Sequence, residues 1–236
     1  MDRPNVMIKL PATDAGLPAV TAALAEGISV NVTLVFGPAR YRQVVDAHLA
    51  GLELAAAAGH DLSRIASVAS FFVSRVDAAV DTRLDKSGTA AARSLRGQAA
   101  LANARLAYAL HETVLAGPRR RALAARGARP QRPRWASTGV KDPAYDATRY
   151  VTGLVASGTV NTMPRATLDA VLGHGEPAGD TIRGTYEDSR RTLAALADEG
   201  VDLAAIADEL ETDGVARFQD SWQQLTHDIR TALQGR

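Results

Sequence analysis

The chain has 236 residues, and 27 Lys and Arg stand against 26 Asp and Glu, which gives a formal net charge of +1. This near-neutral charge argues against bulk nucleic-acid binding, which needs a surplus of basic side chains. The sequence has no cysteine, so disulfides, thiolate metal sites and a cysteine nucleophile are excluded. No apolar run approaches the roughly 18 residues of a membrane helix, and the start lacks the features of a secretory signal. We therefore expect a cytoplasmic protein with no membrane or nucleic-acid partner.

Short strand-like runs alternate with longer helix-like runs in the first third of the chain. Apolar and β-branched residues predict strands at 5–10, 29–36 and 65–73. Between them, apolar residues at helical spacing predict helices that begin near Leu17 and Tyr41. This alternation is typical of βαβ units, in which parallel strands are joined by helical crossovers.

The second part of the chain is more helical. Residues 77–127 are rich in Ala, Arg and Leu and predict one or two long helices, and 181–236 form a helical tail with one break. Short strands are expected at 135–138 and 159–163, with a helix at 145–156 between them.

Five strands without a low-complexity linker predict one α/β domain spanning residues 1–236, with a parallel sheet. A Gly-x-Gly-x-x-Gly turn and a P-loop motif are both absent from the sequence, so it carries no nucleotide-binding signature. A (β/α)8 barrel fits the alternation, but eight units and about 250 residues are its normal size. Five units predict a partial barrel.

Lys9 is the strongest candidate for chemistry. It alternates with Ile8 and Leu10, so the apolar side chains lie on one strand face and the lysine on the other. An inward-facing lysine has a lowered pKa, and the neutral amine is the form that attacks carbonyl groups. The alternative is a lysine at a strand end that extends into solvent.

Polar residues recur on the same face of the following strands. Asn31 and Thr33 alternate with valines in the second strand, and Ser70 shares a face with Phe72 in the third. The carboxyl ends of parallel barrel strands are where such enzymes hold their active sites. Their recurrence on successive strands therefore predicts a shared site.

Residues just beyond the strand ends suit an anionic group. Arg75 follows the third strand, and Ser137 and Lys141 follow the fourth. Cations beside hydroxyl groups bind phosphate, although a solvated surface pair explains the two cations equally well.

Metal binding and nucleic-acid binding are not indicated. The five histidines show no metal-ligand spacing, and we expect His48 and His111 to lie at or near the surface of helices. The basic run at 119–134 has no interleaved aromatic residue before Trp135, so we expect a helix end and connection with a solvated basic face.

The stretches that contain these residues resemble the transaldolase family, in its long bacterial branch, over essentially the whole chain. The stretches are NVMIKLPATDAGLPA, GISVNVTLVF, SVASFFVSRVD, WASTGVKDPAY, TVNTMP and GVARFQDSWQQL. The most specific is the first, in which a lysine in an apolar strand precedes Pro-Ala-Thr and Gly-Leu.

The resemblance implies a transferase of the pentose phosphate pathway built on a (β/α)8 barrel. Such an enzyme moves a dihydroxyacetone unit from sedoheptulose 7-phosphate to glyceraldehyde 3-phosphate through a lysine Schiff base, without metal or cofactor. Lys9 matches the Schiff-base lysine, while Asn31 and Thr33 match residues that hold substrate hydroxyls and the catalytic water. The residues that match the phosphate site, with Lys141 near the position of an arginine common in the family, are Ser70, Arg75, Ser137 and Lys141.

The family's lysine lies on the fourth barrel strand, whereas here it is residue 9. We therefore expect units four to eight of the barrel, without the family's Asp on strand one and Glu on strand three, and a truncated chain of weak or no activity. The alternatives are a non-catalytic sugar-phosphate-binding remnant, a fragment that needs a partner or a homo-oligomer to complete the barrel, and an interaction protein that uses Phe218 and Trp222.

Overall fold

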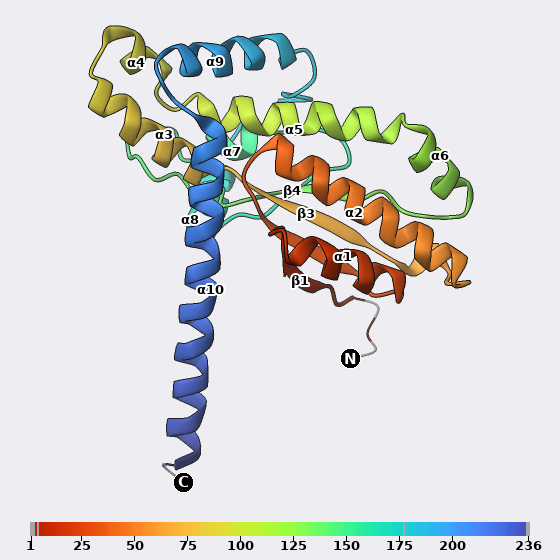
Figure 1. The fold of residues 1–236 in the computed structure, drawn as a ribbon. Coiled ribbons are helices and arrows are strands. Elements are labelled where there is room, and N and C mark those ends of the chain that lie inside the picture. Colours follow the sequence, from red (N-terminus) through yellow and green to blue (C-terminus); the bar gives the residue numbers. More distant parts are fainter. Residues whose placement is uncertain (1–2, 4, 177, 235–236) are drawn as a thin grey trace.

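The fold is α/β, with one parallel sheet whose strands follow each other in chain order (Figure 1). The computed structural model describes residues 3, 5–176 and 178–234, so the last two residues of the expected tail lie outside the described part. Neighbouring strands are parallel throughout, as in a segment of a (β/α)8 barrel. The strands are β1 Ile8–Pro11, β2 Val30–Val35, β3 Ser67–Phe72, β4 Arg132–Ala136 and β5 Val160–Asn161.

Helices connect the strands and continue beyond the sheet. The longest, α10, runs from the body of the molecule to the C-terminus and projects well past the other elements (Figure 1). No helix in the described residues is both long and apolar enough to cross a membrane. The helices are α1 Gly16–Ala25, α2 Pro38–Ala57, α3 Ser74–Ser87, α4 Ala90–Leu95, α5 Ala99–Leu115, α6 Pro118–Ala125, α7 Arg149–Thr152, α8 Arg165–His174, α9 Tyr186–Asp198 and α10 Leu203–Gln234, with a 3-10 turn at Leu62–Arg64.

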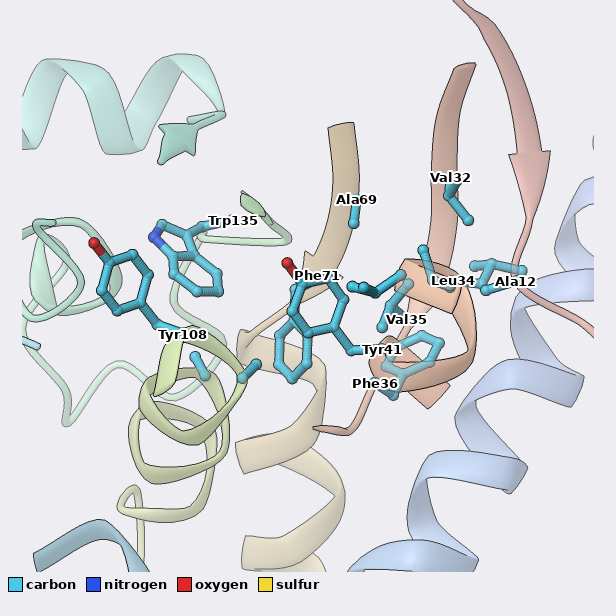
Figure 2. Packing of buried hydrophobic residues seen from close by; sticks show 14 of the residues in the cluster. Ala12, Val32, Leu34, Val35, Phe36, Tyr41, Ala69, Phe71, Tyr108 and Trp135 are labelled. Carbon is cyan, nitrogen blue, oxygen red and sulfur yellow. The ribbon is translucent and has the colours of Figure 1, made fainter. Parts of the chain in front are cut away.

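The core lies between the sheet and its covering helices. Phe71 of β3 meets Trp135 of β4 and Tyr41 of α2 edge to face, with ring centroids 6.0 and 6.4 Å apart (Figure 2). Val32 and Ala69 are fully buried on the same side. Because side chains alternate along a strand, this buried face leaves the remaining side chains of each strand on the opposite face.

The prediction of one or two long helices at 77–127 is wrong, because this stretch forms four shorter helices. Gly88 and Gly97 have φ of 66° and 68°, a left-handed conformation that ends a helix and that glycine adopts without strain. Farther on, Gly117 precedes Pro118, which begins α6. Glycines at these turns therefore divide the segment.

The helix expected at 145–156 is also shorter, covering only Arg149–Thr152. Asp142 accepts a hydrogen bond from the Ala144 amide at 2.9 Å, and Asp146 accepts one from the Thr148 amide at 2.7 Å. Such aspartate turns compete with helix formation. Helix α8 was not predicted, and the expected tail begins as a helix only at Tyr186.

Strand β4 begins at Arg132, three residues before the predicted start. Pro133 lies inside it, in register with Ala69 of β3. The pairing with β5 covers only Arg134 and Trp135, so the proline, which has no amide hydrogen, has a strand neighbour on one side only.

Ile8 was expected to pack outward on helices, but it is 45 % exposed. In the described residues β1 pairs only with β2 and is therefore an edge strand. An edge strand has fewer covering neighbours, which leaves its apolar side chain in contact with solvent.

His48 and His111 do not lie at the surface as expected. They are 3 % and 4 % exposed, within α2 and α5. Burial lowers the pKa of His48 to about 3 and that of His111 to about 4, because the apolar surroundings disfavour the imidazolium. Both side chains therefore fold as neutral imidazoles.

This burial predicts acid sensitivity. In the unfolded chain His48 takes up a proton below its ordinary pKa of about 6.5, whereas in the folded state it does so only near 3. The stability is thus complete above pH 6.5 and decreases as the pH falls, by about 2 kcal/mol between pH 7 and pH 5 for this group. We expect His48→Leu to lose less unfolding free energy than the wild type between pH 7 and pH 5, as measured by urea unfolding at both pH values. His227→Leu, at an exposed position of α10, is the matched control, and equal losses in the His48 variant and the wild type would contradict the prediction.

Candidate functional site

Lys9 lies on the sheet face opposite the covering helices, in register with Asn31 of the next strand. The Lys9 side chain is exposed, but the protein atoms around its ammonium group, together with the positive charge of Arg134, lower the pKa of Lys9. Its Nζ is 5.5 Å from the ring centroid of Phe218 on α10, a cation–π distance. The lysine thus has an environment that favours the neutral amine more than water does.

Asn31, Ser70 and Arg134 form one hydrogen-bonded chain across three strands. The Arg134 Nη1 donates to Ser70 Oγ at 2.8 Å, and Ser70 Oγ donates to Asn31 Oδ1 at 2.7 Å. Ser70 is fully buried beneath these partners. Ser70 therefore lies in the same group as Lys9. Its hydroxyl accepts a hydrogen bond from Arg134 and donates one to Asn31.

Thr33 is in register with Pro11, two residues along from the Lys9–Asn31 pair. The side chain is 1 % exposed, and its hydroxyl has no hydrogen-bond partner among the residues that the structure describes. A buried hydroxyl without a partner costs free energy unless water or a ligand satisfies it. The position suits an ordered water molecule.

Ser137 and Ser74 meet at the carboxyl ends of β4 and β3. Their hydroxyl oxygens are 3.0 Å apart, and the Ser74 amide donates to the Ser137 carbonyl at 2.9 Å. Ser74 begins α3, so the amino end of this helix lies at the same edge of the sheet. Ser137 has φ of 54°, a left-handed backbone that a residue with a side chain adopts at a cost of about 1–3 kcal/mol.

Arg75, the second residue of α3, stacks on Phe72 with 5.3 Å between the guanidinium carbon and the ring centroid. Burial lowers the pKa of Arg75, the nearby Arg217 lowers it further, and Asp213 opposes both. Two arginines facing each other disfavour their own charges, and an anion between them would relieve that repulsion. Arg217 and Asp213 both belong to α10.

Lys141 lines a cavity of about 330 Å³ that also contains Ser74. The cavity is held by two hydrogen bonds of 2.6 Å, from the Tyr145 hydroxyl to Asp81 and from the Tyr150 hydroxyl to Asp77. Burial raises the pKa of Asp77 despite the Tyr150 hydroxyl and the Ala100 amide, which both donate to its carboxylate. Ser74 thus lies between Ser137 and the Lys141 cavity.

Helix α10 packs closely against β2 at Gly214. A Cβ at Gly214 would lie 2.6 Å from Leu34 Cδ2, so a larger residue here would require either the buried Leu34 side chain or the helix to shift. Leu34 itself has φ of 62°. One turn farther along the helix, Phe218 reaches Lys9. The contact between Gly214 and Leu34 therefore sets the position of the ring over the lysine.

The predicted residues lie in two groups. The first contains Lys9, Asn31, Thr33 and Ser70. The second lies at the carboxyl ends of β3 and β4 and contains Arg75, Ser137 and Lys141. The sequence analysis missed Arg134. Arg134 alternates with the apolar Trp135, and this alternation could have placed the two side chains on opposite faces of a strand. The sequence analysis instead interpreted Arg134 as part of a solvated basic run. That interpretation of 119–134 is partly wrong, because the Arg120 guanidinium is buried and donates to the Ala128 carbonyl at 2.9 Å.

Among residues 3, 5–176 and 178–234, no group of three or more His, Asp or Glu is placed to hold a metal ion.

Comparisons with known proteins give a consistent result. The family model described as "Transaldolase/Fructose-6-phosphate aldolase" matches residues 1–229. The protein named "Transaldolase" from Thermobifida fusca (strain YX) is 63 % identical over 233 residues, which cover 99 % of this chain and 63 % of the relative. Parafrankia sp. (strain EAN1pec) has a "Transaldolase" that is 59 % identical over 233 residues with the same two coverages. The chain spans 63 % of the length of these two curated relatives.

The Gly214 contact predicts how the site responds to an added side chain. Gly214→Val places atoms closer to Leu34 than van der Waals contact allows. Because the Leu34 side chain is buried in the core, we expect α10 to move away and the protein to lose about 1–3 kcal/mol of stability. As Phe218 leaves Lys9, acetic anhydride should modify Lys9 faster, as measured by peptide mass spectrometry. Ala216→Val, at an exposed position of the same helix, should change neither quantity by a comparable amount. A Gly214 variant that leaves both stability and Lys9 modification unchanged would refute this role.

Proposed function

Since the chain belongs to the transaldolase/fructose-6-phosphate aldolase family, we propose that it binds ketose phosphates and attacks their carbonyl carbon with Lys9, as a transaldolase of the pentose phosphate pathway. The proposed donor is sedoheptulose 7-phosphate and the proposed acceptor glyceraldehyde 3-phosphate, with a dihydroxyacetone unit transferred between them. The observation that carries the proposal is the row of Lys9, Asn31 and Ser70 on one face of the sheet. The cytoplasmic location remains a prediction from the sequence.

The first chemical step uses Lys9 in its neutral form. Its Nζ forms a bond to the carbonyl carbon, the carbonyl oxygen leaves as water with the two amine protons, and the imine takes a proton from solvent. The iminium then accepts the electron pair of the carbon–carbon bond that breaks, so the step needs no metal or other cofactor. The lowered pKa of Lys9 supports this role, since it raises the fraction of free amine at neutral pH.

Asn31 and Thr33 are proposed to complete the carbonyl end of the site. The Oδ1 of Asn31 accepts from Ser70, so its Nδ2 is the group left to donate to a substrate hydroxyl. The buried, unpartnered hydroxyl of Thr33 suits the water that is released and taken up during imine formation. In this proposal Ser70 acts on substrate through Asn31, because its own hydroxyl is engaged on both sides.

The phosphate group is proposed to bind at the carboxyl ends of β3 and β4. Arg75 supplies a guanidinium, Ser137 a hydroxyl, and the amino end of α3 a favourable helix dipole. Lys141, which lines the same cavity as Ser74, contributes a point charge without bidentate geometry.

A second candidate function is sugar-phosphate binding without turnover. It is favoured by one observation: among the described residues, no carboxylate acts on Lys9 or hydrogen-bonds to Asn31 or Thr33. Transfer of an aldol unit needs a base for the substrate hydroxyl. A homo-oligomer, or a partner that pairs with an open strand edge and completes the barrel, is the proposed source of such a carboxylate in this case.

Trapping with fructose 6-phosphate and borohydride tests the nucleophile. The sequence holds three lysines, Lys9, Lys86 and Lys141, so a reduced adduct is readily assigned by peptide mass spectrometry. We expect modification of Lys9 that is lost in Lys9→Met and retained in Lys86→Met, whose lysine is exposed. A six-carbon adduct alone supports binding without cleavage, whereas a three-carbon adduct shows that the carbon–carbon bond breaks. Wild-type protein without any adduct on Lys9 would refute the proposal.

Arg75 is expected to recognise the phosphate and not the sugar. Arg75→Met should raise the half-saturating concentration of fructose 6-phosphate in the trapping assay at least tenfold, because a charge-assisted contact of about 1.5–3 kcal/mol is lost. The half-saturating concentration of unphosphorylated fructose should stay within about twofold of the wild type. Arg93→Met, an exposed arginine of α4, is the control. An equal effect on both sugars would place Arg75 outside the phosphate site.

A further inference from the structure

Arg134 is the one charged residue of the described chain that acts on Lys9. It lies on β4, whose other side chains at Pro133 and Trp135 are buried toward the helices. Strand alternation therefore turns the Arg134 side chain to the opposite face, where Lys9, Asn31 and Ser70 also lie. Arg132 shares this face, but it is exposed and has no part in the hydrogen-bonded chain.

The hydrogen bonds around Ser70 run in one direction, from Arg134 through Ser70 to Asn31. A guanidinium has donors and no acceptor, so Ser70 Oγ must accept from Arg134. The single hydroxyl proton of Ser70 is then available to Asn31, whose Oδ1 is 2.7 Å away. The amide of Asn31 is thereby fixed with Nδ2 turned away from Ser70. Without the guanidinium the hydroxyl could rotate, and the Asn31 amide would lose its fixed orientation.

The charge of Arg134 acts on Lys9 in the same direction as burial does. Among the neighbouring elements that the structure describes, β2 and α1 contain no ionisable side chain, and the charged residues Asp213 and Arg217 of α10 act on Arg75. A guanidinium stays protonated throughout the physiological range. It is therefore a permanent like charge that disfavours the Lys9 ammonium and favours the free amine.

We propose that Arg134 is a positioning residue for the Lys9 centre, which orients the Asn31 amide through Ser70 and adds a fixed positive charge to the sheet face that carries Lys9. This role rests on the proposed function for its chemical purpose. The hydrogen bonds from Arg134 to Ser70 and from Ser70 to Asn31 do not depend on a substrate. The role of Arg134 and the proposed function can therefore be refuted separately.

The test is competitive modification of the three lysines with acetic anhydride between pH 6 and pH 10, followed by peptide mass spectrometry. In Arg134→Met the pH midpoint of Lys9 modification should rise toward that of Lys86 in the same sample, with a severalfold slower reaction of Lys9 at pH 7. Arg134→Lys keeps the charge and should keep the midpoint near that of the wild type. Arg132→Met removes an arginine from the same strand and face and should leave the midpoint unchanged.

The Asn31 orientation has its own measurement. In cyanoborohydride trapping with fructose 6-phosphate at a pH above the midpoints of all variants, Arg134→Met should raise the half-saturating sugar concentration severalfold, and Arg132→Met should not. Circular dichroism and urea unfolding show whether Arg134→Met remains folded. If it does not, Arg134→Gln, which removes the charge but keeps an amide donor for Ser70, replaces it in the midpoint measurement with the same expected rise.

Three outcomes separate the possibilities. A Lys9 midpoint that is the same in Arg134→Met and the wild type would overturn the inference, as would an equal shift in Arg132→Met. A shifted midpoint in Arg134→Met, restored in Arg134→Lys, would support it. A wild-type protein that forms no ketose adduct would refute the proposed function, while the modification midpoints still decide the role of Arg134.

Discussion

The alternation of side chains along parallel strands is the constraint on which both the core and the candidate site depend. In β4 the order Pro133, Arg134, Trp135 sends an indole into the core and a guanidinium to the opposite face. The parallel register then aligns the polar face of β4 with those of the other strands, so Ser70 and Asn31 lie within one hydrogen-bonded chain. A shift of one residue in any strand would exchange these faces. The apolar packing in Figure 2 therefore also fixes the polar row.

Helix α10 adds a second constraint, which local periodicity does not contain. Gly214 allows close contact with Leu34, and the helix then places Phe218 near Lys9 and Arg217 near Arg75. Both halves of the candidate site thus receive a residue from an element that follows them by more than one hundred positions in the chain. The exposed apolar side chains farther along α10, including Trp222, take no part in this contact.

The parallel sheet and the strand face on which Lys9 lies followed from the sequence because both depend on short-range patterns. Burial of Lys9 did not follow, since the residue is exposed on the edge strand β1. Alternation over three or four residues was enough for Lys9, Asn31 and Ser70. Helix lengths were predicted less well, because the left-handed glycines Gly88 and Gly97 divide a stretch whose composition is uniformly helical. Arg134 was missed for a different reason. In a basic run every arginine resembles its neighbours, and only the burial of Trp135 beside it separates the one that faces Ser70 from those that face solvent.

Several energetically costly features lie at the carboxyl ends of the strands. Leu34 and Ser137 adopt left-handed backbones at the ends of β2 and β4, Thr33 has a buried hydroxyl without a partner among the described residues, and the charge of Arg217 acts on Arg75. Each feature costs free energy, and two of them would be relieved by a ligand: water for the hydroxyl and an anion for the arginines. A sequence under selection for stability alone would replace them with small changes. Their concentration at the carboxyl ends of parallel strands, beside a lysine whose pKa is lowered, is the pattern expected where stability is given up for binding and chemistry.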